Sequence, residues 1–145
     1  MKVFLDTNIV ISYLDSQRAD HEDAVKLIAD FYKMDILMIL SQDIMTNVIY
    51  NCTNKKQAVE FFKTINADSH FKIVSFSSDM IDSACKKYLE SNNFSKKSDF
   101  EDMLQYFCAL ENGCERIYTN DKSTFPKLNI SLYDSSQKPF YLAKS

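Results

Sequence analysis

The chain has 145 residues and a mass of 16.8 kDa, with 46% hydrophobic and 26% charged residues and a formal net charge of −3. This composition is typical of a folded globular protein, and a chain of this length buries about two-thirds of its unfolded surface. The single glycine, Gly113, excludes the glycine-rich phosphate-binding loops of nucleotide hydrolases and dinucleotide-binding enzymes. The net charge is too small to indicate a partner.

The cysteines and the apolar segments indicate the compartment. The four cysteines include no C-x-x-C pair, which predicts reduced core thiols in a cytoplasmic protein. The longest aliphatic run, residues 36–40, is too short to span a bilayer, and Asp6 and Asn8 interrupt any signal-peptide core. We therefore predict one domain over residues 1–145, with no membrane association.

In chain order, the predicted elements alternate between strands and helices. Apolar runs and helical spacing predict, in turn, a strand at 2–5, helices at 7–14 and 20–34, a strand at 36–40, and helices at 41–50 and 54–65. The second half adds a strand at 72–76, a helix at 77–90, a helix from 98 to 113, a strand at 116–119 and a candidate strand at 130–133. Such alternation predicts a three-layer α/β/α sandwich with a parallel sheet of four or five strands.

Several helix ends carry local signals. Ser41 and Asn54 are predicted to cap the helices that follow them, and either Ser77 or Ser78 caps the helix ending near residue 90. The run Ser98-Asp99-Phe100-Glu101 is a capping box at the start of the most apolar helix. Gly113 is the expected left-handed residue at the end of that helix.

Four aspartates are predicted to gather at one edge of the sheet. Asp6 directly follows the first strand, Asp121 follows the fourth strand by two residues, and the carboxyl ends of parallel strands share an edge. Asp99 and Asp102 lie at the start of the helix preceding the fourth strand. Taken singly, each aspartate also has a structural explanation as a turn or first-turn residue. Together they repel one another, and a hard divalent cation such as Mg²⁺ or Mn²⁺ relieves that repulsion. Such an ion also orients a phosphodiester and lowers the pKa of a water nucleophile.

Three motifs resemble the PIN domain family in their order and spacing. The opening strand leads into Asp6-Thr7-Asn8, the acidic helix carries the run S-D-F-E-D-M-L-Q over residues 98–105, and the fourth strand ends in Thr119-Asn120-Asp121. The segment at 15–18, followed by a helix from residue 20, also resembles the family. The resemblance therefore extends over nearly the whole chain.

The resemblance implies a metal-dependent endoribonuclease of the kind that acts as the toxin in bacterial toxin–antitoxin pairs. It implies catalytic, metal-binding roles for Asp6, Asp102 and Asp121, with Asp99 as a further ligand. Asn8 and Thr119 are implied as supporting residues. RNA is the implied substrate and an antitoxin the implied partner, with Mg²⁺ or Mn²⁺ as cofactor.

Two further expectations concern partners. Lys96 and Lys97 directly precede the acidic helix and are predicted to contact RNA phosphates, against the alternative of ordinary solvated lysines. The density of apolar residues over 36–62, including Met38, Tyr50 and Phe62, predicts a homodimer, as the resemblance also does.

The sequence departs from the family pattern at two positions. Asn47 lies six residues after Ser41, where the family usually carries Glu, and an amide brings no charge to a metal. Asp43, one turn earlier, either substitutes for that Glu or is an ordinary first-turn acid. Asn120 occupies the usual basic position of the last motif. These departures leave Asn47 as a supporting residue and concern activity rather than fold.

Two alternatives to a nuclease stay open. A PIN fold without catalytic activity would bind RNA or a protein partner, and Asn47 favours that alternative. A phosphoaspartyl phosphatase would use Asp6 as nucleophile, but Asn8 stands where those enzymes carry a second Asp.

Overall fold

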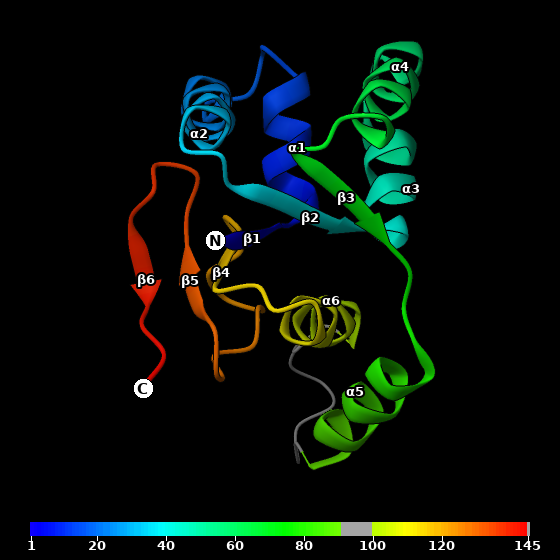
Figure 1. The fold of residues 1–145 in the computed structure, drawn as a ribbon, viewed down its shortest axis with the longest axis vertical. Helices are drawn as coiled ribbons and strands as arrows, with labels where there is room; N and C mark the ends of the chain where they lie inside the picture. Colours follow the sequence, from blue (N-terminus) through cyan, green and yellow to red (C-terminus); the bar gives the residue numbers. More distant parts are fainter. Residues whose placement is uncertain (91–99, 145) are drawn as a thin grey trace.

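The computed structural model describes residues 1–90 and 100–144 and has three layers (Figure 1). Its described residues form the strands β1 (Lys2–Leu5), β2 (Leu37–Ser41), β3 (Phe71–Val74), β4 (Arg116–Tyr118), β5 (Ser131–Tyr133) and β6 (Pro139–Tyr141). The helices are α1 (Thr7–Leu14), α2 (His21–Lys33), α3 (Gln42–Asn51), α4 (Lys55–Asn66), α5 (Ser78–Glu90) and α6 (Phe100–Glu111). Helices α1 to α4 lie on one side of the sheet and α5 and α6 on the other, as the predicted α/β/α sandwich requires. In the described part, no helix is long and apolar enough to cross a membrane.

The sheet has the strand order β3-β2-β1-β4-β5-β6 and is parallel except at one edge. β6 runs antiparallel to β5, so the expectation of four or five strands, all parallel, was incomplete. β6 has only three residues and begins at Pro139, which lacks the N–H that a sheet ladder needs. Its position depends on pairing with β5 rather than on a local apolar pattern.

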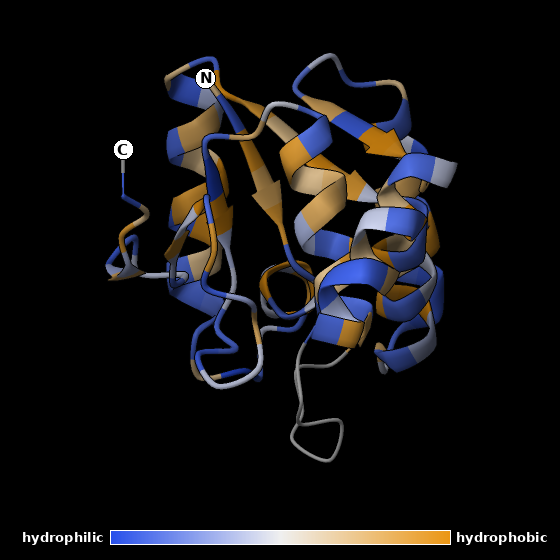
Figure 2. Ribbon diagram, turned by 90° about the horizontal axis from the view of Figure 1, so that it is seen from below, coloured by the Kyte–Doolittle hydropathy of each residue, from blue (hydrophilic) through white to orange (hydrophobic). Residues whose placement is uncertain are grey.

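The core is centred on β1. Val3, Phe4 and Leu5 are fully buried, because β1 pairs with β2 on one side and with β4 on the other. Helices cover both faces of this strand, which explains why its sequence is a continuous apolar run rather than an alternating one. Figure 2 shows that apolar residues gather along the inner strands and polar residues along the outer surfaces of the helices.

The predicted helix signals are used as expected where the structure describes them. Ser41 accepts a hydrogen bond from the backbone N–H of Ile44 at 3.0 Å, and Asn54 accepts one from that of Gln57 at 3.0 Å. Ser77, rather than Ser78, caps α5. Gly113 follows α6 with a φ of 73°, a left-handed conformation that costs glycine little.

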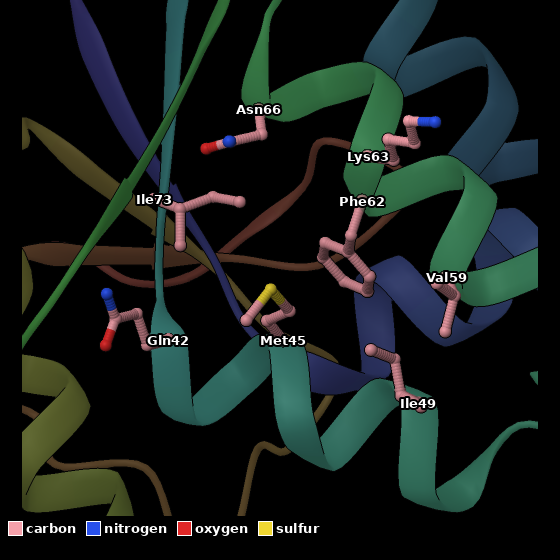
Figure 3. A pocket seen from close by; sticks show the side chains of 8 residues that line it. All are labelled: Gln42, Met45, Ile49, Val59, Phe62, Lys63, Asn66 and Ile73. Atoms are coloured by element: carbon pink, nitrogen blue, oxygen red, sulfur yellow. The ribbon is translucent and has the colours of Figure 1, made fainter.

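The apolar surplus expected over residues 36–62 is smaller than the sequence indicated. Met38 and Phe62 belong to the core, with 0% and 4% exposure. Tyr50 at 83% and Val59 at 50% are exposed on α3 and α4. Between these helices lies a hollow of about 470 Å³, which we call the apolar pocket. Figure 3 shows Met45 and Ile49 of α3 facing Val59 and Phe62 of α4 around it.

Candidate active site

Asp6 and Thr119 are held together by the pairing of β1 with β4. Leu5 lies beside Tyr118 in the parallel register, and the backbone N–H of Asp6 donates to the carbonyl of Tyr118 at 3.0 Å. The next residues of both strands therefore leave the sheet side by side. The hydroxyl of Thr119 donates to Oδ2 of Asp6 at 2.7 Å, and both side chains are buried.

Asp6 has a structural role as well as a place in the site. It is the N-cap of α1, and its Oδ1 accepts from the backbone N–H of Thr7 at 2.8 Å. Asn8 supports the other oxygen: its amide donates to Thr119 Oγ1 at 3.3 Å and lies 3.5 Å from Asp6 Oδ2. Its own Oδ1 accepts from the backbone N–H of Asn120 at 3.0 Å. The two predicted supporting residues, Asn8 and Thr119, thus fix the orientation of Asp6.

Asp102 and Asp121 meet through Thr124, a residue for which the sequence predicts no role in the site. The Thr124 hydroxyl lies 2.8 Å from Oδ2 of Asp102 and also contacts Oδ2 of Asp121. Because a hydroxyl carries one proton, it supplies a single donor to two carboxylates. The signal in the sequence was the Asp121-Lys122-Ser123-Thr124 turn, in which Asp121 Oδ1 accepts from the N–H groups of Ser123 and Thr124.

The turn also affects the charge of Asp121. Burial raises its pKa, but hydrogen bonds from Thr124 and Ser123 outweigh burial and hold the pKa below the ordinary value. Asp121 is therefore ionised at neutral pH.

Three of the four predicted aspartates line one hollow of about 340 Å³, which we call the acidic pocket. Its described lining consists of Asp6, Thr7, Asn8, Ile11, Arg18, Asn47, Asn51, Glu101, Asp102 and Asp121. Asp6 and Asp102 are only 6% and 8% exposed. Arg18 is the one basic residue among these described lining residues. The pocket therefore contains four carboxylate side chains and one positively charged side chain. Asp99, Lys96 and Lys97 lie outside the described residues.

Glu101 is a member of the acidic pocket that the sequence analysis assigned only to a helix cap. The amide of Asn47 donates to Oε2 of Glu101 at 2.9 Å, so α3 and α6 meet at this point. Asn47 thus reaches the site as a donor to a carboxylate.

Asp43 does not line the acidic pocket. Its Oδ2 accepts from Gln105 at 2.9 Å and from Asn47 at 3.4 Å. These contacts join α3 to α6 and favour the second alternative for Asp43, a structural acid, over a substitute ligand.

The donor set of the acidic pocket fits a hard cation. All its charged acceptors are carboxylate oxygens, which Mg²⁺ and Mn²⁺ prefer, and an ion would offset their repulsion. Among the described residues, no three His, Cys, Asp or Glu side chains already form a group that could hold a metal ion. Mg²⁺ commonly binds through one or two carboxylates and keeps several waters, so a pre-formed protein cage is not required.

Fold and site together define an α/β protein with a carboxylate-lined pocket at the carboxyl ends of its parallel strands. The PIN domain family matches residues 3–130 of the chain. Ribonuclease VapC1 from Aquifex aeolicus (strain VF5) is 30% identical over 126 residues, which are 86% of this chain and 84% of that protein. The chain belongs to the PIN domain family.

Solved structures show the same fold. VapC20 from Mycobacterium tuberculosis, described as a Sarcin-Ricin loop cleaving toxin, aligns with a TM-score of 0.68 at 16% identity, covering 84% of this chain and 92% of that one. VapBC2 from Rickettsia felis, bound to a DNA fragment from its promoter, aligns with a TM-score of 0.62 at 18% identity, covering 92% and 98%.

Proposed function

We propose that the protein is a Mg²⁺- or Mn²⁺-dependent endoribonuclease and the toxin of a toxin–antitoxin pair. The observation that carries this proposal is the meeting of Asp6, Asp102 and Asp121 in one pocket, from three separate elements. The relationship to Ribonuclease VapC1 and to VapC and VapBC structures supports RNA as substrate and an antitoxin as partner.

Different side chains of the acidic pocket would bind the metal, orient its carboxylate ligands and contact the RNA. Asp6, Asp102 and Asp121, with Glu101 beside them, would hold the metal. The bound metal would lower the pKa of a water nucleophile and offset charge on the leaving oxygen. Thr119 and Asn8 keep Asp6 in one orientation, and Thr124 links Asp102 to Asp121. Arg18 is placed to contact an RNA phosphate, and Lys96 and Lys97 stay predicted RNA contacts.

The test is the Asp102→Asn variant, assayed on RNA with Mn²⁺. We expect no measurable cleavage, because a hard cation in an open site depends on few charged ligands. We expect an unchanged circular dichroism spectrum and equal or greater stability of the metal-free variant, since one of several repelling acids is gone. Asp79→Asn, an equivalent change at an exposed acid in the first turn of α5, is the matched control and should cut RNA normally.

Two results would contradict this proposal. The first is RNA cleavage by Asp102→Asn at the wild-type rate. The second is wild-type cleavage that persists in excess EDTA. RNA that is bound in a gel-shift assay but never cut would instead support the inactive, binding form of the fold, which Asn47 favours.

A further inference from the structure

A second polar hollow is lined in part from the same region of the chain as the acidic pocket. It measures about 330 Å³, and we call it the loop pocket; it is lined by residues 13–16, His21, residues 52–54 and Gln57. Part of each lining comes from the same region of the chain, α1 with the loop after it and the end of α3. Asn51 lines the acidic pocket and Cys52 the loop pocket, and consecutive Cα atoms are only about 3.8 Å apart. Arg18, which lines the acidic pocket, is also bonded through its backbone to Asp15 and His21, which line the loop pocket.

Two acceptors on the wall of the loop pocket come from Asp15 and His21, beside hydroxyl and amide side chains that can both donate and accept. Asp15 accepts from the backbone N–H of Gln17 at 3.0 Å through Oδ1, and no described donor reaches its Oδ2. His21 Nδ1 lies 2.8 Å from the carbonyl of Ser12, which can only accept, so Nδ1 carries the proton. In that tautomer the other ring nitrogen, Nε2, carries no proton and can accept.

The loop that carries these groups is held in place. Asp20 accepts from Ser12 Oγ at 2.7 Å and from the amide of Asn120 at 2.6 Å, so the start of α2 is tied to α1 and to the end of β4. The backbone N–H of Arg18 donates to Asp15, and that of His21 donates to Arg18. This rigidity allows the pocket to select a ligand by its hydrogen-bonding pattern.

The charges around the loop pocket favour a nucleobase inside the pocket and a phosphate group at its border. Asp15 is its one formally charged residue among the described lining, which disfavours a phosphate within. Arg18 lines the neighbouring acidic pocket. The backbone N–H of Arg18 donates to the carbonyl of Asp15 at 3.1 Å, so this cation stands at the border of the loop pocket.

We propose that the loop pocket binds a guanine base of the RNA, next to the phosphodiester that faces the acidic pocket. Guanine is the base that presents two adjacent N–H donors, at N1 and N2, and a carboxylate with a neighbouring acceptor matches them. Arg18 would contact the phosphate between base and cleavage site. This inference rests on the proposed ribonuclease function and names the nucleotide that such an enzyme reads.

Binding of mononucleotides to the full-length, ¹⁵N-labelled protein in EDTA tests the inference without cleavage. Titration with GMP should shift the amide signals of Asp15, His21 and Asn54, and GMP should bind roughly tenfold tighter than AMP, CMP or UMP, the low end of what one bidentate base contact supplies. Asp15→Asn should abolish this preference, because an amide offers one acceptor and a repelling NH₂ group. Arg18→Gln should weaken all four nucleotides alike.

Controls keep the two proposals separable. Asp23→Asn changes an exposed acid on α2 outside the pocket and should keep the preference for GMP. Equal affinity for all four nucleotides, an unchanged preference in Asp15→Asn, or no binding at all would overturn the inference. Selective GMP binding by a protein that cuts no RNA in Mn²⁺ would support the base site and refute the proposed ribonuclease. Cleavage without any preference for guanine beside the cut would support the proposed ribonuclease and refute the base site.

Discussion

Asn47 is neutral, but it is hydrogen-bonded to Glu101, whose carboxylate brings a negative charge to the same part of the acidic pocket. Position 47 carries an amide in place of the family's usual carboxylate, yet this amide donates to a carboxylate on α6 that lines the same pocket. The charge is thus supplied by a different helix. We expect Glu101 to contribute to metal binding from that position.

Exchanging the two side chains tests this expectation. Glu101→Gln should weaken Mn²⁺ binding about tenfold, because affinity for a hard cation follows the number of charged ligands. The double variant Asn47→Glu/Glu101→Gln should regain most of that affinity, since the charge returns to the same region. Asn47→Glu alone should bind Mn²⁺ more tightly. Without metal it should unfold more easily, because the new carboxylate lies beside those of Asp43 and Glu101 and is repelled by them.

Calorimetric titration with Mn²⁺ measures all three variants. Glu111→Gln, which neutralises an exposed acid at the other end of α6, is the control and should bind like wild type. Wild-type affinity in Glu101→Gln would show that Glu101 lies outside the metal's coordination sphere.

At the scale of elements, the β5–β6 hairpin depends on one partly buried carboxylate in its turn. Asp134 Oδ1 accepts from the backbone N–H groups of Ser136 and Lys138 at 2.9 and 3.1 Å, and Oδ2 lies 3.4 Å from Lys122 Nζ. Burial raises the pKa of Asp134, but the Ser136 hydroxyl, the backbone N–H of Lys138 and the Lys122 ammonium hold it below its ordinary value of 3.8. The ionised form of Asp134 therefore stabilises the folded protein.

Replacing Asp134 with Asn should show this stabilisation as a pH dependence. At pH 7 we expect the free energy of unfolding to fall by about 1.5 kcal/mol, the low end of the net value of one hydrogen bond to a charged group. Because the folded pKa is depressed, the contribution is complete well above 3.8 and is lost as the pH falls through the lower, folded value. Urea denaturation of both proteins at pH 7 and pH 3 measures the difference. A constant difference at both pH values would contradict the role of ionised Asp134.

At the scale of the whole molecule, the face formed by α3 and α4 is the surface on which we expect self-association. Tyr50 and Val59 are exposed there, and the apolar pocket lies between the two helices. A stable dimer buries about 800 Å² on each partner, and exposed apolar residues around a hollow are typical of such interfaces. The homodimer predicted from the sequence is therefore retained as a proposal, on fewer residues than first expected.

Val59→Glu should convert this dimer to a monomer, because a charge buried in an apolar interface is left unpaired. Size-exclusion chromatography with light scattering at high micromolar concentration measures the mass. Leu89→Glu makes the same kind of change at a residue of α5 that is 68% exposed, in the opposite layer, and should leave the dimer intact. A monomeric wild-type protein under these conditions would refute the proposal.

The sequence by itself determined the features whose causes are local. A continuous apolar run followed by Asp6 is a buried parallel strand with a polar residue at its carboxyl end. The shorter buried pair Ile117-Tyr118 likewise leads into a polar turn that contains Asp121. Ser41 and Asn54 bond to N–H groups only three residues away, so their helices could be predicted without the rest of the chain. The layers and the edge that carries the site follow from such patterns.

The tertiary structure decided the features that depend on distant partners. Asn47 and Glu101 are 54 positions apart, and Thr124 reaches Asp102 across 22, so neither contact leaves a periodic trace in the sequence. Burial of Met38 and Phe62 was settled by helices packing over the sheet, which also reduced the expected apolar surface. Which side chains form a site depends on which helices and strands meet there. The packing of the whole core determines that meeting.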